Sequence, residues 1–312
     1  MTARARRVAA LNLLLLAALA ALLQWQWGWN RLLAPWRELP PASVALAAAG
    51  LLASYGLRAL RIYWAEPDIP QGRFGTCLRL VLLNNAFNWL LPMRSGEASF
   101  PILMRRWFEI PAGRATGVLV WLRLLDLHVL AATGVVCIAR GWLGRPLDAP
   151  AQTLVGLLVA APIAVFALRA PLARKLAPGG SRPFLLARQA LDGLPKHAAG
   201  LARDLLLTWS GWGVKLAALG WLLARLAALS PALGVLGAIG GDASTVLPVH
   251  APGGFGTYEA GVLAALAPAR APTARLLAAA VDLHLFVFGS ALVAGAAAWL
   301  SGWRLLDSAA KP

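Results

Sequence analysis

The sequence has few charged residues, and acidic residues are the scarcest of them. Only 13% of its 312 residues are Asp, Glu, Lys or Arg, whereas 59% are hydrophobic. The mean hydropathy of +0.66 is typical of a membrane protein with several spans. This composition predicts no soluble domain, so any chemistry is expected in the bilayer or at its surface.

Cysteine is nearly absent as well. Cys77 and Cys137 both lie in apolar runs, and their spacing matches no metal site. We expect two buried free thiols. The histidines at 128, 250 and 284 match neither a zinc motif nor a nucleophile triad. No metal or other cofactor is therefore expected.

Basic residues outnumber acidic ones, 29 to 13, which gives a net charge of +16. In a soluble protein this excess would indicate nucleic acid. Here no basic stripe is free of hydrophobic segments, so membrane topology and anionic lipid head groups explain it better. The expected partners are the bilayer and a lipid, with no nucleic acid. The sequence does not indicate a protein partner.

Two segments are interrupted by Pro and Gly. Six others are long enough to cross about 30 Å of hydrocarbon once: 8–23, 42–64, 115–139, 151–168, 205–226 and 276–300. We expect 74–108 and 232–267 to be re-entrant helical hairpins, because this topology puts the basic 169–203 loop in the cytoplasm. Both termini are then cytoplasmic. Full-crossing, Pro-kinked helices are the alternative. The expected fold class is all-α, a polytopic membrane protein.

Two polar stretches interrupt the apolar sequence, 84–97 and 242–259, and they resemble each other. Leu91-Pro92 matches Leu247-Pro248, and Asp126-Leu127-His128 matches Asp282-Leu283-His284. Both matches are separated by 156 positions, half of 312. We interpret this as an internal duplication with repeats at 1–150 and 151–312 in inverted topology. Chance matches in a Leu-rich chain are the alternative.

The connection between the repeats, 181–203, mixes leucines with charged residues. It is expected to be an amphipathic segment on the cytoplasmic membrane surface, or else a solvated connector.

The interrupted stretches supply the candidate substrate-binding residues. A helix N-terminus with glycines suits an anionic group, and an arginine strengthens such a site. Asn84 and Asn88 share a helix face and could line a polar path, or they could satisfy the broken backbone. The glycines could equally form only tight turns. The remaining candidates are Arg94, Ser95, Gly96, Glu97, His250, Gly253, Gly254, Gly256 and Glu259.

Ionisable residues inside the apolar segments are costly, about 2.5–3.5 kcal/mol each on insertion scales, which favours a functional role. Arg123 and Asp126 share a face and can neutralise each other, either as part of the substrate site or as a structural pair. Asp282 needs another partner, for which Arg94 and Arg275 are candidates. Residues two apart face different ways, so Asp126 and His128 are not expected in one cavity. Proton-coupling candidates are Glu97, Asp126, Glu259 and Asp282.

These motifs resemble those of the lysylphosphatidylglycerol synthase transmembrane (flippase-like) family. The resemblance covers nearly the whole chain and is carried by Leu90-Leu91-Pro92-x-Arg94-x-Gly96-Glu97, by Arg123-x-x-Asp126, and by Pro248-x-x-x-Pro252-Gly253-Gly254-x-Gly256-x-x-Glu259. It implies a membrane region that moves an aminoacylated phospholipid between leaflets. The best-known members add a soluble aminoacyl-transfer domain. This chain ends at Pro312 without one, so lysyl transfer is not expected.

The sequence therefore predicts a transporter rather than an enzyme, in a bacterial inner membrane. It would translocate an anionic phospholipid or polyprenyl-linked lipid head group through a polar cavity between the hairpins. One alternative is a membrane-embedded enzyme acting on a lipid or polyprenyl phosphate, with Asp126 and Asp282 as acid/base groups or metal ligands. Another is a small-ion or proton-coupled transporter, whose cavity would be closed to lipid.

Overall fold

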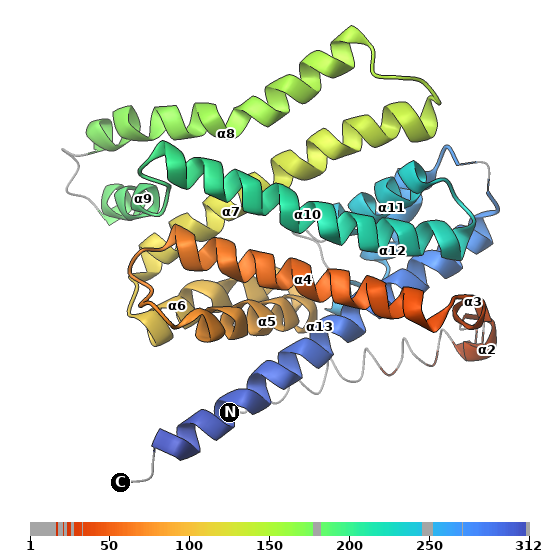
Figure 1. Cartoon of the computed structure of the whole chain (residues 1–312), viewed down its shortest axis with the longest axis horizontal. Helices are drawn as coiled ribbons and strands as arrows, with labels where there is room; N and C mark the ends of the chain where they lie inside the picture. Colours follow the sequence, from red (N-terminus) through yellow and green to blue (C-terminus); the bar gives the residue numbers. More distant parts are fainter. Residues whose placement is uncertain are drawn as a thin grey trace.

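The protein is described by a computed structural model covering residues 28–309, apart from 33, 177–181, 245–251 and 270, plus four isolated positions before residue 28. Every regular element within these residues is helical (Figure 1). The elements are α2 (Trp29–Leu32), α3 (Ala34–Glu38), α4 (Pro41–Ala65), α5 (Phe74–Leu90), η1 (Pro92–Ala98), α6 (Ser99–Phe108), α7 (Ala112–Cys137), η2 (Ile138–Trp142), α8 (Ala149–Leu176), α9 (Arg182–Asp192), α10 (Ala198–Ala227), α11 (Pro231–Ser244), η3 (Pro252–Gly254), α12 (Thr257–Leu266) and α13 (Thr273–Ala309).

Four described helices are long and apolar enough to cross a membrane: α4, α7 with η2, α8 and α13. A fifth candidate is α10 together with α11, which meet at an angle of 111°. Five of the six predicted crossings thus have a matching helix, although α10 qualifies only with α11. The sixth, at 8–23, lies outside the continuously described residues. The all-α polytopic fold class is confirmed.

The first expected hairpin is present as α5, η1 and α6. Helix α5 ends at Leu90. The backbone of the next residue, Leu91, is extended, with a φ of −96° and a ψ of 134°, because the ring of Pro92 disfavours a helical conformation there. The short helix α6 returns alongside α5 and ends at Phe108. The Arg73 guanidinium, just before α5, donates a 3.1 Å hydrogen bond to the Trp107 carbonyl oxygen. Both arms of this hairpin therefore open at the same end of the molecule.

The second hairpin consists of α11, η3 and α12, and its base lies at the other end of α7. The Trp142 indole, just beyond α7, donates a 3.0 Å hydrogen bond to the Ala265 carbonyl oxygen on α12. At the beginning of α7, Arg114 instead pairs with Glu66, beside the base of the first hairpin. The two hairpins thus open toward opposite ends. Whether they enter a bilayer without crossing it stays a prediction.

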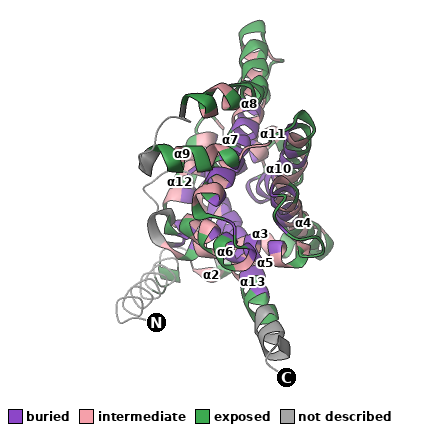
Figure 2. Cartoon of the chain, turned by 90° about the vertical axis from the view of Figure 1, so that its left-hand side faces the viewer, coloured by how far each residue is buried: buried purple, intermediate pink, exposed green. Residues whose placement is uncertain are grey.

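The tips of the two hairpins contact each other, since η1 lies against η3 and α5 also contacts η3. We expected this contact. Around it, α4 pairs with α10, and α13 crosses behind α5 (Figure 1). The buried residues concentrate on α7, α10 and α13, whereas α8 and α9 are mostly exposed (Figure 2). The junction of the hairpins is therefore near the middle of the packed helices.

The connection between the expected repeats divides into two elements. Residues 182–192 form α9, and the remainder leads into α10. Helix α9 packs closely on α7, where a Cβ at Gly117 would collide with the Ala190 backbone. It leaves Phe184, Leu185 and Leu186 exposed. Its location on the membrane surface stays a prediction.

Candidate functional site

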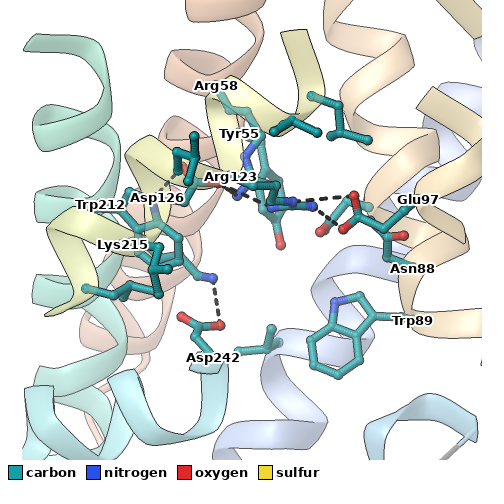
Figure 3. A pocket seen from close by; sticks show the side chains of 17 residues that line it. Tyr55, Arg58, Asn88, Trp89, Glu97, Arg123, Asp126, Trp212, Lys215 and Asp242 are labelled. Carbon is teal, nitrogen blue, oxygen red and sulfur yellow. Dashed lines mark hydrogen bonds and ion pairs between the residues drawn. The ribbon is translucent and has the colours of Figure 1, made fainter. Parts of the chain in front are cut away.

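A cavity of about 410 Å³ lies between the two halves of the chain (Figure 3). Helices α4, α5 and α7 and the tip η1 form one part of its wall, and α10, α11 and α13 form the other. Arg123 reaches into it from α7. Since a helix rises about 1.5 Å per residue, Arg123 lies about 16 Å along the 26-residue α7. The lining residues are Tyr55, Arg58, Asn85, Asn88, Trp89, Glu97, Leu119, Val120, Arg123, Leu124, Asp126, Leu127, Leu130, Trp212, Lys215, Asp242 and Val287.

Asp126 is the centre of the hydrogen bonds in this cavity. Its Oδ1 accepts from the Arg61 guanidinium at 3.0 Å and from the Trp212 indole at 2.9 Å. Its Oδ2 accepts from Arg123 at 3.2 Å and lies 3.8 Å from Arg58. One buried carboxylate therefore orients three arginines from two helices, and excess positive charge remains around it.

Two further ion pairs stand on the cavity walls. Arg123 donates to Glu97 of η1 at 2.5 Å, so its guanidinium bridges Glu97 and Asp126 (Figure 3). Lys215 of α10 donates to Asp242 at the end of α11 at 2.8 Å. These pairs join α7 to the first hairpin and α10 to the second. The charged groups therefore tie the two hairpins to the long helices α7 and α10.

Among the described residues that line the cavity, positive and negative charges are equal in number. Arg58, Arg123 and Lys215 supply three positive charges, and Glu97, Asp126 and Asp242 supply three negative ones. Arg61, behind Asp126, adds a fourth cation, and it also donates to the Thr208 hydroxyl at 2.6 Å. With Arg61 counted, the four cations exceed the three carboxylates by one, but each cation is already paired with a carboxylate, so an anion that enters this cavity must compete with a carboxylate for any one of them.

One wall of the cavity is apolar and accessible from outside. Val120, Leu124 and Leu127 lie on one face of α7 and line the cavity. They are also 51%, 44% and 54% exposed. They occur at mid-length of a spanning helix, so the cavity reaches the lateral surface along this face.

Four of the sequence-predicted site residues line this cavity: Asn88, Glu97, Arg123 and Asp126. Asn84 does not, because its amide donates to the Gly96 carbonyl at 3.2 Å and to the Ser99 hydroxyl at 2.9 Å. These contacts agree with the alternative in which Asn84 satisfies polar groups of the interrupted backbone and does not line a polar path.

The other predicted binding residues support the hairpin tips. Gly96 packs so closely on α5 that a Cβ there would collide with the Phe87 carbonyl group. Gly253 has a φ of 70°, in the left-handed region that favours glycine. Glu259 binds the Gly256 N–H and His284. Ser95, Gly96, Gly253, Gly254, Gly256 and Glu259 are not among the described lining residues. The Arg94 side chain and His250 lie outside the described part of the chain.

The two Asp-Leu-His motifs have different environments. Asp126 lines the cavity, whereas His128 packs edge-on against Trp209 with ring centroids 5.7 Å apart, as their spacing predicts. Asp282 is fully buried near Trp36 and away from the cavity. Its carboxylate has no hydrogen-bond partner within 3.5 Å among the described residues. Arg275 as its partner was therefore wrong, and Asp126 and Asp282 do not form one site.

Sequence reasoning missed several lining residues. Arg58 and Arg61 were not among the predicted site residues, yet both lie inside α4 and face Asp126. Their spacing of three, within an apolar segment, could have indicated a shared inward face. Lys215, the lone lysine of its apolar segment, gave a similar signal. Tyr55, Asn85, Trp89, Trp212 and Asp242 were also missed as cavity residues.

A comparison with protein families decides the assignment. The family model described as the lysylphosphatidylglycerol synthase TM region matches residues 9–295, nearly the whole chain. The chain belongs to this family. No curated protein and no solved structure matches the chain. This lysylphosphatidylglycerol synthase TM-region protein is therefore a multi-pass membrane protein whose family is related to lipid handling.

Proposed function

We propose that this protein is a lipid translocase, which moves a phospholipid or polyprenyl-linked lipid with an anionic head group between leaflets. The observation that carries the proposal is the charged cavity at mid-length of α7, together with its exposed apolar wall. A head group can enter past Val120, Leu124 and Leu127 while the acyl chains stay in hydrocarbon. This lateral access favours a lipid over a small ion, for which a cavity closed to lipid would be expected.

The head group would bind by exchange of ion-pair partners. A phosphate oxygen that approaches Arg123 can replace the Glu97 carboxylate, because both present acceptors to the same guanidinium. Arg58 on the same wall and Lys215 on the opposite wall would also stabilise the phosphate. The replaced carboxylate must then be protonated or find another donor, since an unpaired charge at this depth is costly. Exchange of partners allows the lipid to bind and also to leave.

The test is reconstitution into liposomes that carry a fluorescent acidic phospholipid or a fluorescent polyprenyl phosphate. A membrane-impermeant quencher then reports the lipid that moves between leaflets. Vesicles with the protein should exchange the label faster than empty vesicles. Arg123→Gln should lower the rate at least about tenfold, because the guanidinium contributes hydrogen bonds to a charged group worth about 1.5–3 kcal/mol.

Arg145→Gln is the matched control. Arg145 is exposed and pairs with Asp148, outside the cavity, so this substitution should leave the rate unchanged. If no labelled lipid moves faster than in empty vesicles, the translocase proposal is wrong. If Arg145→Gln slows exchange as much as Arg123→Gln, the cavity is not the route.

A further inference from the structure

His284 of α13 is enclosed by the tip of the second hairpin. Its ring is fully buried and stacks on Tyr258 at 4.6 Å and on Phe255 at 4.2 Å between ring centroids. Nδ1 lies 2.7 Å from Glu259 Oε1, and Nε2 lies 2.8 Å from the Gly253 carbonyl oxygen. Both ring nitrogens therefore have oxygen partners, one on each side of the tip.

These two contacts fix the number of protons that the pair must hold. A carbonyl oxygen only accepts, so Nε2 must carry a hydrogen to bond Gly253. Nδ1 then needs a second proton between it and Glu259, held by the imidazole or by the carboxyl group. The other Glu259 oxygen, Oε2, already accepts the Gly256 N–H at 2.7 Å. The pair thus holds two protons and is neutral overall in either arrangement.

We propose that His284 and Glu259 form a buried proton-binding site that holds the tip of the second hairpin closed. If the pair loses one proton, only one ring nitrogen can donate. Either Nε2 then faces the Gly253 carbonyl, or Nδ1 faces the Glu259 carboxylate, with two acceptors in contact. A buried polar group that lacks its partner is costly, so the contact opens. Proton loss therefore releases Gly253 or Glu259 from α13.

The released tip would act on the cavity through Trp89. This side chain lines the cavity and packs on the His284 ring at 5.2 Å and on the Tyr258 ring at 6.1 Å. Among the described residues, Tyr258 is a further titratable group that faces the pair. The charge of Asp242 on α11, which lines the cavity, reaches Tyr258. A structural change at His284 can therefore reach the cavity through one layer of aromatic side chains, which includes Trp89.

Hydrogen–deuterium exchange of the backbone amides of residues 252–266 tests the proposal. The exchange is measured at a series of pH values from below to above neutral. The matched variant is Glu259→Gln, whose amide can accept from Gly256 and donate to Nδ1 of a neutral His284. All contacts are then satisfied at every pH. At equal pH the chemical exchange rates are the same in both proteins. Above the pH at which the pair loses its proton, wild-type amides should exchange increasingly faster than those of Glu259→Gln. The ratio of the two exchange rates should rise about tenfold per pH unit, as the loss of one proton requires.

A ratio that stays constant across this pH range overturns the proposal. His284→Leu gives a second measurement if Glu259→Gln does not fold. This variant has no polar side-chain atom and makes neither contact, so its tip should exchange fast at every pH, and the wild-type rate should approach it as pH rises. A tip in His284→Leu that is still slow at low pH and faster at high pH would assign the proton elsewhere. Neither measurement needs lipid movement, so they stand apart from the translocase test.

Discussion

Lys215 and Asp242 form an ion pair in which both partners are largely removed from solvent. Their side chains are 14% and 6% exposed, and the ammonium also lies 4.7 Å from the centre of the Trp212 ring. Loss of Lys215 breaks this buried pair, and breaking a buried ion pair by removing one member costs up to about 3–5 kcal/mol. Lys215→Met should therefore lower the free energy of unfolding by about this amount, measured by thermal unfolding in detergent.

The double substitution Lys215→Met with Asp242→Asn is the informative control. It removes both charges, so most of the lost stability should return. If the two single effects simply add, the pair is not coupled and Lys215 acts through packing alone.

Glu97 should make lipid exchange dependent on pH. This carboxylate is 20% exposed and competes with a head group for Arg123. Protonation of Glu97 removes one of the two carboxylates that hold the Arg123 guanidinium, so under the translocase proposal wild-type exchange should slow as pH rises. Glu97→Gln should keep exchange fast at the higher pH. As a control, Asp148→Asn removes a carboxylate of an exposed pair outside the cavity and should retain the wild-type pH profile. If Glu97→Gln leaves the pH profile unchanged, Glu97 does not cause the pH dependence.

Residue spacing predicted which side chains contact each other within one helix, but it predicted few of the contacts between helices. The spacing of three in Arg123 and Asp126 correctly indicated a shared face. The partners from α4 and α10 could not be foreseen, because helix packing decides which face of Arg58 or Trp212 meets Asp126. The same limit explains Asp282, for which the nearest arginine in sequence, Arg275, is not the partner.

At the scale of elements, the first hairpin depends on close backbone contact. The returning segment crosses α5 at Gly96, where a Cβ would collide with the Phe87 carbonyl group and the Asn88 nitrogen. Gly96→Ala should cost about 1–3 kcal/mol, because the backbone must shift. Gly75→Ala on the same helix α5 meets no atom within 4 Å and should stabilise by up to about 1 kcal/mol. Thermal unfolding of both variants compares them; equal effects would mean that η1 does not need this contact.

The limits of both hairpins were predictable to within one residue. Proline and glycine end helices by steric rules that act locally, so the breaks at Pro92 and beyond Ser244 can be read from the sequence. The association of α9 with α7 was not predictable. It depends on small residues such as Gly117, whose close packing has no periodic signal.

At the scale of the whole molecule, each end is identified by contacts between helix termini. Arg114 at the start of α7 pairs with Glu66 and Asp68 after α4, and Arg203 near the start of α10 donates to the Trp64 carbonyl oxygen. These termini share one end with the base of the first hairpin. The end of α7, the base of the second hairpin and the start of α8 lie at the other.

Basic residues are concentrated at the first of these ends, which should therefore be cytoplasmic. Gln71, between α4 and α5, and Gln152, near the start of α8, are exposed at opposite ends. The native Cys77 and Cys137 are buried and should react slowly. In intact cells, an impermeant thiol reagent should label Gln152→Cys and leave Gln71→Cys unlabelled until the membrane is opened.

If the first hairpin crossed the bilayer fully, the ends of α4 and α7 that share the Arg114 contacts would be forced apart. Labelling of Gln71→Cys from outside would reverse the orientation, and labelling of both positions would contradict the placement of these two ends on opposite sides.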